Sequence, residues 1–341
     1  MIYLDHAAAT PVCAKALSAM RSYFDEEFYN PSSAYLPAKK VLADYEAAKK
    51  TIAHSVGAKG SDLVVTAGAT EANNLAFTCL SADGSVERIH GKARVLYLET
   101  EHDSVRAVAW QHGGKAVRVL PSGLVNLADL REKITDETEL ISVSLANNEL
   151  GTIQPLVEVA GIIREVKLDR MRRGVRTQLL LHSDASQAMN LLDINVARLG
   201  GDLLTLNSAK VYGPKGVGAL YVSHEARLRP LTVGGGQERG LRSGTENVPG
   251  VVGFAVALSE AKGHIKSSRA KYRELKRILL SELQDYELIN KKHALDNFVV
   301  LCYDGLDAER LIFLLEERGI YVATGAACAA SKGVRSHVLE A

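Results

Sequence analysis

A single cysteine near the end of the chain has the setting of a reactive thiol. Cys328 lies in "YVATGAACAASKG", residues 321–333, among alanines, glycines and a serine. Free cysteine is usually packed among apolar neighbours, but no apolar periodicity surrounds this one. A thiolate attacks best where it is exposed and where its pKa lies near the ambient pH. The segment therefore predicts an accessible nucleophile on a loop that moves.

Polar side chains follow a series of short apolar runs. The runs stand in "DLVVTAGATE", "RVLYLETEHDS", "LISVSLANNELG", "LLLHSDASQ" and "LLTLNSAKVYGPKG". In an open α/β sheet, ligands bind beyond the carboxyl ends of the strands. The five successive runs therefore predict one shared site, to which their ends contribute Thr70, Glu71, His102, Asn147, Asn148, Asp184, Gln187, Ser208 and Lys210.

The stretch "TAGATEANN", residues 66–74, suits an anionic group such as phosphate. Gly68 permits a tight turn, and the helix expected after it offers free N–H groups beside the Thr70 hydroxyl. An equally simple interpretation makes Thr70 the N-cap of that helix, with Glu71 in its first turn. Neither G-x-G-x-x-G nor a P-loop pattern follows a strand, which disfavours dinucleotides and nucleoside triphosphates.

A phosphate pocket, an acid after one strand and a lysine after the next indicate a site for pyridoxal 5'-phosphate (PLP). This cofactor needs a lysine amine for a Schiff base and a carboxylate that keeps the pyridine nitrogen protonated. Asp184 and Lys210 end consecutive predicted strands and would face each other across the cofactor. Taken singly, the aspartate also suits a turn or cap, and the lysine a solvated surface position. Lys215 is the rival for the Schiff base.

The elements that must position these residues predict an α/β fold. Apolar runs without alternation are typical of strands buried on both faces, and helical stretches between them imply parallel pairing. We expect a mostly parallel, doubly wound sheet in a large domain of residues 15–260. Helical patterns at 267–284 and 307–319 then flank a strand pattern at 297–303. With residues 1–14, residues 261–341 are expected to form a smaller α+β domain that carries the Cys328 segment.

Bulk composition excludes several classes of protein. The chain has 341 residues, 47% hydrophobic and 24% charged, with a formal net charge of +1, so nothing favours direct nucleic-acid binding or a membrane anchor. No run approaches the roughly 20 apolar residues of a membrane span, and the start "MIYLDH" is not typical of a signal peptide. The four cysteines are scattered, which argues against a disulfide or metal site and favours the reducing cytoplasm. We expect core packing for Cys79 and Cys302 and assign no role to Cys13.

Ordered stretches along nearly the whole chain resemble the NifS/IscS-like cysteine desulfurases, in the class V aminotransferase group of fold-type I PLP enzymes. The matching stretches are "YLDHAAATP", "NPSSAY", "VVTAGATEANNLA", "TEHDSV", "NNELGTIQP", "HSDASQA", "AKVYGPKGVGALYV", "GGGQERGLRSGTENVPG" and "TGAACAAS". Together they are far more specific than any one motif. The fold that this resemblance implies agrees with the architecture predicted above.

The resemblance also implies catalytic roles. Lys210 matches the Schiff-base lysine, Asp184 the partner of the pyridine nitrogen, and Gln187 the residue that bonds the phenolic oxygen of the cofactor. His102 matches a histidine stacked on the ring and available for proton transfer. Cys328 matches the nucleophile that takes sulfur from substrate cysteine and carries it as a persulfide.

Further residues are implied to bind the cofactor and substrate. Thr70 and the backbone at Ala69 match the phosphate cradle, and Ser208 is expected to join them. Asn148 matches an asparagine close to cofactor and substrate. Thr245 matches a threonine that reaches the phosphate of the neighbouring subunit, so the resemblance implies a homodimer with shared active sites.

The implied reaction converts L-cysteine to L-alanine, with the freed Lys210 as the base for the α-proton. Sulfur then passes from Cys328 to an acceptor protein, such as an iron–sulfur scaffold or a tRNA-thiolation enzyme. Two alternatives stay open: another class V PLP lyase or aminotransferase, and a relative that dimerises or binds partners without turnover. A thiol on a mobile loop favours the desulfurase.

The chain departs from the family pattern at two places that concern cofactor and substrate binding, besides Tyr35 and Pro37 where histidine and glycine are common. Where the family has Ser-Gly-His or a similar triplet before the lysine, this sequence has Asn207, Ser208 and Ala209, so side-chain phosphate ligands are changed. The family also continues beyond "SHVLEA", residues 336–341, with an arginine for the substrate carboxylate that Arg335 does not match. A fork-shaped arginine contact is hard to replace, so we expect retained PLP binding with impaired turnover.

Overall fold

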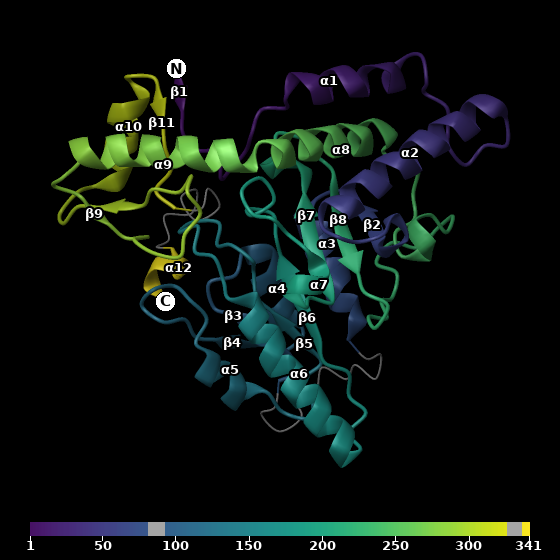
Figure 1. Ribbon diagram of the computed structural model, residues 1–341, viewed down its shortest axis with the longest axis horizontal. Coiled ribbons are helices and arrows are strands. Elements are labelled where there is room, and N and C mark those ends of the chain that lie inside the picture. The colour runs from purple at the N-terminus through teal and green to yellow at the C-terminus, as the bar shows by residue number, and fades with distance from the viewer. Residues whose placement is uncertain (81–92, 326–335) are drawn as a thin grey trace.

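The computed structural model describes residues 1–80, 93–325 and 336–341 and is built around a seven-stranded sheet (Figure 1). The strand order is β2-β8-β7-β6-β5-β3-β4. All neighbours from β7 to β4 are parallel, whereas β8 runs antiparallel to both β2 and β7. The predicted mostly parallel sheet is confirmed. The strands are β2 (Leu63–Thr66), β3 (Val95–Leu98), β4 (Lys115–Val117), β5 (Leu140–Ser142), β6 (Leu180–Asp184), β7 (Leu203–Asn207) and β8 (Gly218–Val222).

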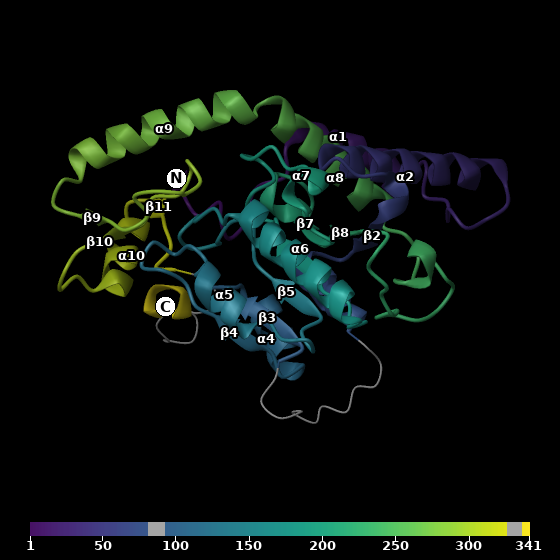
Figure 2. The ribbon, with the colours of Figure 1, turned by 60° about the horizontal axis from the view of Figure 1, so that its bottom comes forward.

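Helices cover both faces of this sheet, as double winding requires. Successive residues of a strand point to opposite faces, and Val64 accordingly belongs to one core while Val65 belongs to the other. Figure 2 shows α1, α2 and α8 lying together along one side of the sheet. The Val65 face is covered by α2 (Leu36–Ser55), α5 (Leu127–Lys133), α6 (Leu156–Arg173) and α8 (Val248–Gly263), with α1 (Ala14–Met20) packed on α8; the Val64 face is covered by α3 (Ala69–Ala76) and α4 (Asp103–Gln111).

The remaining elements gather at one side of the molecule, on the left in Figure 1. The first strand pairs in parallel with a strand near the C-terminal end, and a second two-stranded sheet is antiparallel. The domain boundaries themselves stay a prediction. These elements are β1 (Ile2–Tyr3), α9 (Ile265–Glu282), β9 (Glu287–Leu288), β10 (Leu301–Cys302), α10 (Ala308–Glu316), β11 (Ile320–Tyr321) and α12 (His337–Glu340).

The strand expected at 297–303 is only two residues long, because a side chain takes two of the backbone groups before it. Asn290 Oδ1 accepts from Val300 N at 3.1 Å, and Asn290 Nδ2 donates to Phe298 O at 3.1 Å. The pairing of β10 therefore begins only at Leu301. Short elements complete the described chain: α7 (Val196–Leu199) and the 3₁₀ turns η1 (Arg21–Phe24), η2 (Gly60–Asp62), η3 (Phe77–Cys79), η4 (Ser208–Lys210) and η5 (Glu238–Gly240).

Within the residues that the structure describes, none of the helices has the length and apolar character needed to cross a membrane.

Gly218 lies where the sheet meets the two predicted site segments. In the ladder it pairs with Thr66 on one side and Asn207 on the other. A Cβ at this position would lie 2.7 Å from the carbonyl carbon of Gly68 and 2.8 Å from Leu206 O. Both contacts are to backbone, which has no freedom to move aside, so only glycine fits here.

We predict that Gly218→Ala destabilises the fold by about 2 kcal/mol, because overpacking against backbone forces the strands apart. Gly161→Ala is the matched control, since a Cβ in the middle of α6 meets nothing within 4 Å. The control is expected to stabilise by roughly 0.5–1 kcal/mol through higher helix propensity. Urea unfolding of both variants measures the two effects, and equal stability of the two variants would show that the close approach at Gly218 is wrong.

Candidate active site

The carboxyl end of β6 carries a buried carboxylate that two N–H donors hold in place. Asp184 is 9% exposed. Asn73 Nδ2, from α3, donates to Asp184 Oδ2 at 2.9 Å, and the backbone N–H of Ser186 donates to Oδ1 at 2.9 Å. Each oxygen retains acceptor capacity. Asp184 is therefore fixed in position and able to accept one more hydrogen bond, such as one from a protonated ring nitrogen.

A chain of hydrogen bonds joins Asp184 to His102. Asn73 Nδ2 also donates to Ser104 Oγ at 2.8 Å, and Ser104 Oγ lies 2.9 Å from His102 Nδ1. Because the amide nitrogen only donates, the Ser104 hydroxyl accepts from it and donates to Nδ1. The backbone N–H of Ser104 also donates to Nδ1, at 3.1 Å, so His102 is the N-cap of α4. The acceptor role of Nδ1 places the ring proton of His102 on Nε2.

Lys210 and Gln187 meet at the N-terminal segment. Beyond the end of β7, the turn η4 brings Lys210 toward the carboxyl end of the sheet. Lys210 Nζ donates to the carbonyl oxygens of Ala7 and Ala8, at 2.6 and 2.7 Å. Gln187 Nε2 donates to the same Ala7 oxygen at 2.9 Å. Side chains from two adjacent strand ends thus converge on one backbone carbonyl.

The rival lysine lies apart from this convergence. Lys215 is exposed, and its Nζ lies 3.4 Å from Thr10 O. Lys210, by contrast, is half-buried and shares its acceptor with Gln187. The placement favours Lys210 as the lysine of the site.

The turn from β2 into α3 has the form of an anion-binding turn. Gly68 is the N-cap of α3 with φ 148°, a conformation that favours glycine, and no side chain caps the helix. Thr70 is therefore not the N-cap. It lies exposed in the first helical turn, one residue after Ala69. The first N–H groups of α3 and the Thr70 hydroxyl are thus available to a phosphate.

The structure does not support the predicted phosphate contact of Ser208. This residue is fully buried, its Oγ packs against Gly213, and Oγ has no hydrogen-bond partner among the described residues. The 3₁₀ turn η4 directs its side chain into the protein rather than toward a ligand. Asn207, which is half-buried, instead uses its Oδ1 to accept from Ala209 N at 3.2 Å.

The other predicted site residues lie in three different settings. Asn148 is half-buried, whereas the neighbouring Asn147 is a buried structural residue whose Nδ2 donates to Thr100 O. Thr245 is exposed and lines a hollow beside the end of β2. Cys328 lies outside the described residues.

The donor set brought together here fits PLP. A fixed carboxylate, a lysine amine, an amide side chain and a helix N-terminus suit a ring nitrogen, an aldehyde, a phenolic oxygen and a phosphate, respectively. Among the described residues, the buried Asn73 Oδ1 and Ser186 Oγ beside Asp184 have no hydrogen-bond partner, so polar capacity remains at this end of the sheet. The chemistry of the residues therefore agrees with the predicted cofactor.

Asp184 has two ionisable neighbours that are neutral near pH 7. Burial, followed by the negative charge of Asp184, raises the pKa of Glu101 to about 8. Burial lowers the pKa of His182 to about 4 against the opposing influence of Asp184. His182 precedes Asp184 by two residues on β6 and bonds to the hydroxyls of Ser142 and Thr205. The local negative charge is therefore concentrated on Asp184.

Several residues of the site were missed from the sequence. Asn73 and Ser104 form the link to His102, Glu101 is the neutral acid, and Ala7 supplies the shared carbonyl. The first three stand within the matching stretches "ATEANN" and "TEHDSV". Asn73 could have been recognised from the sequence, because it is an amide that follows Ala72 on the side of the predicted helix that also carries Ala76. A backbone acceptor such as Ala7 O leaves no signal in a sequence.

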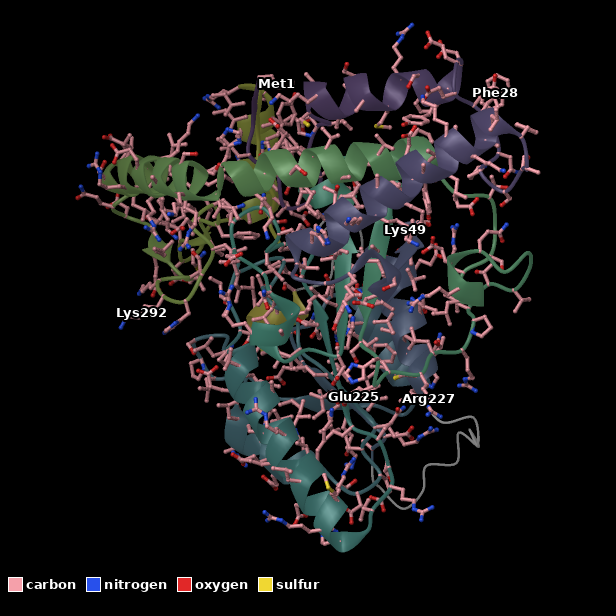
Figure 3. All side chains as sticks on the ribbon, turned by 45° about the vertical axis from the view of Figure 1, so that its right-hand side comes forward. Met1, Phe28, Lys49, Glu225, Arg227 and Lys292 are labelled. Carbon is pink, nitrogen blue, oxygen red and sulfur yellow. The ribbon has the colours of Figure 1, made fainter. Side chains whose placement is uncertain are left out.

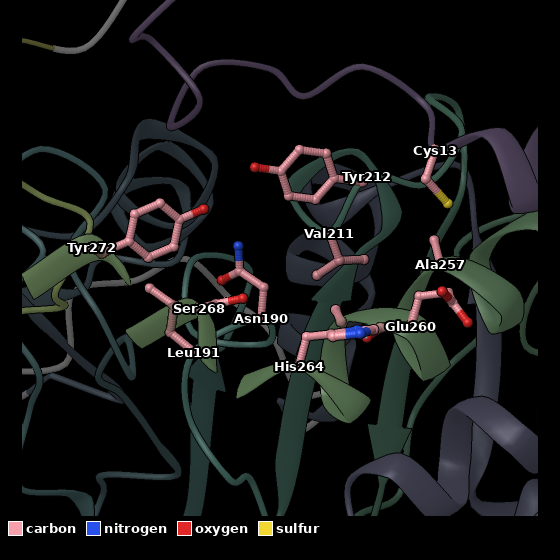
Figure 4. Close-up of a pocket in the computed structure, with 11 residues that line it drawn as sticks. Cys13, Asn190, Leu191, Val211, Tyr212, Ala257, Glu260, His264, Ser268 and Tyr272 are labelled. Atoms are coloured by element: carbon pink, nitrogen blue, oxygen red, sulfur yellow. The ribbon is translucent and has the colours of Figure 1, made fainter. Parts of the chain in front are cut away.

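A cavity of about 190 Å³ lies behind the Lys210 turn and is separate from the predicted site (Figure 4). None of the predicted site residues lines it. Figure 4 shows Tyr212, Tyr272 and His264 around it, with Cys13 at one end. We assign no ligand to this cavity.

Comparison with known proteins places the whole chain in one group. The profile of the family described as aminotransferase class-V matches residues 2–339. "Cysteine desulfurase IscS 1" of Archaeoglobus fulgidus is 37% identical over 350 residues, which cover 100% of this chain and 87% of the relative. "Cysteine desulfurase IscS" of Methanosarcina thermophila is 37% identical over 351 residues, with 100% and 83% covered.

Solved structures show the same likeness. A "NifS-like protein" superimposes with a TM-score of 0.87 at 30% identity, over 99% of this chain and 91% of that one. A structure titled "SspA in complex with cysteine" gives a TM-score of 0.84 at 32% identity, over 100% and 94% of the two chains.

We predict that Glu101→Gln removes a pH dependence of stability. Between the ordinary pKa of 4.5 and the folded value of about 8, the folded chain holds a proton at Glu101 that the unfolded chain has lost. The contribution of Glu101 to stability is therefore full below pH 4.5 and is lost as the pH rises through 8. The slope is at most about 1.4 kcal/mol per pH unit, and glutamine has none.

Urea unfolding at several values from about pH 5 to about pH 8 checks this effect. The free energy of unfolding of Glu101→Gln should rise relative to that of the unchanged chain as the pH increases. Asp103→Asn, an exposed acid two residues along, is the control and should follow the unchanged chain. Parallel curves for all three proteins would mean that Glu101 is ionised in the folded state.

Proposed function

The chain belongs to the class V aminotransferase family of PLP-dependent enzymes, and we propose that it is a cysteine desulfurase that converts L-cysteine to L-alanine. The observation that carries the proposal is that Lys210 and Gln187 both donate to Ala7 O. These two side chains follow the adjacent strands β7 and β6, and β6 ends in Asp184. Relatives named cysteine desulfurase that are 37% identical over the full chain, and a similar structure titled as a cysteine complex, support the choice of substrate.

PLP, when bound, supplies an aldehyde that reacts with amines and a protonated ring that draws electrons away from the substrate α-carbon. Asp184 holds the charge that keeps the ring nitrogen protonated. Gln187 offers its amide N–H to the phenolic oxygen, and Thr70 with the first N–H groups of α3 holds the phosphate. His102, with its proton on Nε2, would provide a donor for proton transfer beside the bound cofactor.

Lys210 moves the proton at the substrate α-carbon. Its amine lies against the Ala7 and Ala8 carbonyls, which orient it without neutralising its charge. An amine that has given up its proton is a base, and one that has gained a proton is an acid, so the same residue removes and returns protons during turnover.

Cys328 accepts the sulfur. Its thiolate attacks the sulfur of the substrate cysteine, so that an S–S bond forms while the bond between sulfur and the β-carbon breaks. The β-carbon keeps the electron pair of that bond and gains a proton, which yields alanine and a persulfide on Cys328. Cysteine and a thiol become alanine and a persulfide, so no further oxidant or reductant is required.

We further propose a cytoplasmic homodimer that delivers sulfur to an acceptor protein, such as an iron–sulfur scaffold or a tRNA-thiolation enzyme. Large apolar side chains lie exposed around the connection of α1 to α2 and on the segment that carries Thr245; Leu36 and Val233 are each 80% exposed. Figure 3 shows Phe28 at the outer end of that connection. Exposed apolar surface of this kind supports a protein interface. In a homodimer built on it, Thr245 of one copy would reach the cofactor phosphate of the other copy.

We predict that Lys210→Ala abolishes the visible absorption band of the lysine-bound cofactor, because no other amine of the described site converges on Gln187. Lys215→Ala is the control and should keep the band, since this exposed lysine lies apart from the site. Absorption spectra of both purified variants after addition of PLP decide the matter. Loss of the band in Lys215→Ala together with its retention in Lys210→Ala would show that Lys215, and not Lys210, binds the cofactor.

We predict that Cys328→Ser lowers sulfide release from L-cysteine by at least about 100-fold, because a hydroxyl neither attacks sulfur as a thiolate does nor carries it as a persulfide. The absorption band of the cofactor should persist. The core packing expected for Cys302 is wrong, because the short strand β10 leaves this residue exposed, whereas Cys79 is buried as expected. Cys302→Ser is therefore the control and should leave the rate unchanged. Normal sulfide release from Cys328→Ser would contradict the persulfide step while leaving the PLP site intact.

A further inference from the structure

The segment that carries Thr245 is glycine-rich yet internally braced. This segment, residues 231–246, is called the arm; it follows β8 and is the green loop to the right of β2 in Figure 1. Leu231 N donates to Leu241 O at 3.3 Å, Ser243 N to Thr232 O at 3.0 Å, and Gly244 N to a side-chain oxygen within the arm at 3.0 Å. These bonds close the arm on itself, so that it moves as one body if it moves at all.

One carboxylate of the arm is buried in the body of the protein. Glu238 Oε1 accepts from the Tyr45 hydroxyl at 2.6 Å and from Lys49 Nζ at 2.9 Å. Its Oε2 accepts from Lys49 Nζ at 3.1 Å and from the backbone N–H of Val65 at 2.7 Å. The side chains of Glu238 and Lys49 are only 5% and 7% exposed. Figure 3 marks Lys49 on α2.

These contacts keep the arm in a conformation that its residues rarely adopt. Glu238 has φ 48° and Arg239 has φ 61°, in the left-handed region that disfavours residues with a Cβ. An exposed loop would relax out of this conformation. The bonds from α2 and β2 to the Glu238 carboxylate offset its cost, so the strain marks a position that the surrounding structure determines.

A second tie runs from the arm to the phosphate-binding turn. Arg242 Nε donates to Glu71 Oε1 at 2.8 Å, and Glu71 Oε2 accepts from Ala67 N at 2.8 Å. The Glu238 carboxylate bonds Val65 two residues earlier on the same strand. The Glu238 contact therefore ends at Val65 before Gly68, and the Arg242 contact ends at Glu71 after Gly68. Both contacts fix the connection of β2 to α3.

The arm and this connection share one hollow. Thr66 and Ala67 from the end of β2, and Arg242 and Thr245 from the arm, line a cavity of about 130 Å³. The Thr245 hydroxyl is thus held at a fixed place on its own subunit, from which it would reach the phosphate of the second copy in the proposed homodimer.

We infer that Glu238 is a positioning residue for the cofactor phosphate of the second copy in the proposed homodimer, acting through the arm that it anchors and through Thr245. The inference rests on the proposed function and adds to it a residue that no phosphate touches. A carboxylate suits this task because four donor contacts surround its two oxygens. An amide in its place would turn an N–H group toward a donor and would leave Lys49 buried without a counter-charge.

The plain alternative is that Glu238 only stabilises the fold. Asp129→Asn separates the two readings, because the side chain of Asp129 is 2% exposed and accepts from Arg118 N, Arg118 Nε and Lys133 Nζ at 2.9, 2.7 and 2.7 Å. It is a comparably buried, cation-paired carboxylate on α5, outside the arm. A stabilising role alone predicts that both variants unfold more easily and that both bind PLP as the unchanged chain does.

The test measures the dissociation constant of PLP by dialysis of the purified holoenzyme for four variants. We expect Glu238→Gln and Thr245→Ala each to weaken PLP binding by about tenfold, the effect of losing one positioned contact. The double variant should be no weaker than the weaker single variant, because both changes remove the same contact. Asp129→Asn should stay within about twofold of the unchanged chain although it lowers stability. Hydrogen exchange of the amides of residues 231–246 should rise in Glu238→Gln only.

Tyr45→Phe provides a milder variant if Glu238→Gln fails to fold, since it removes one bond and leaves the charge pair; about threefold weaker PLP binding is expected. Unchanged PLP affinity in Glu238→Gln or Tyr45→Phe, or additive losses in the double variant, would overturn the positioning role while leaving the desulfurase proposal untouched. An unchanged chain that binds no PLP would instead overturn the proposed function, and the inference with it.

Discussion

The carboxylate of Asp184 carries a charge while almost fully removed from water, and this constrains everything around it. Burying a charge is costly unless donors surround it, and here the Asn73 amide and the Ser186 N–H serve that purpose. Glu101 close by keeps its proton, because its own burial and then repulsion from the charge of Asp184 raise its pKa to about 8. His182 beneath it is neutral as well. One defined negative charge thus stands at the end of β6, ready for a cationic partner.

The sheet topology supplies the second constraint. Because β8 is antiparallel to both β2 and β7, the strands β2 and β7 run in the same direction, with β8 between them. The Gly68 turn after β2 and the Lys210 turn after β7 therefore emerge at the same edge of the sheet. Gly218 pairs with a residue at the end of each strand, and its missing side chain allows the two turns to approach.

Much of this arrangement could be predicted from the sequence because it depends on local patterns. Six of the seven central strands stand at apolar runs, namely the five runs given above and "GALYV" at β8. Asp184 is the last residue of one of these strands, β6, and Lys210 follows another, β7, at the end of a short turn. The strand β4 gave no such run, since it is short and Lys115 in it is exposed. The direction in which a given side chain points was not predictable. In η4 successive side chains turn by about a third of a circle, so no pattern tells that Ser208 points inward.

Other failures of sequence reasoning have a different cause. Asn73 matters because α3 lays it against β6, a contact between residues 111 positions apart. The neutrality of Glu101 comes from its total burial, which no residue near it in the sequence announces. The sequence pattern predicts helices, strands and the ends of strands. Hydrogen bonds between these elements, and the protonation states that depend on burial, are known only once the elements are packed.

The N-terminal segment connects the lysine to the part of the molecule that carries the thiol. Thr10 Oγ1 donates to Ala209 O at 2.9 Å and accepts from Tyr212 N at 3.0 Å, which ties the segment to both sides of Lys210. The same segment continues from β1, which pairs with β11. Cys328 follows the end of β11, at Tyr321, by seven residues, the difference of the two numbers. The proposed base, Lys210, and the proposed sulfur carrier, Cys328, are therefore linked to the two strands of one ladder, the first by hydrogen bonds and the second by its place in the sequence. The pairing of β1 with β11 thus sets where the Ala7 and Ala8 carbonyls, which accept from Lys210 Nζ, lie relative to Tyr321.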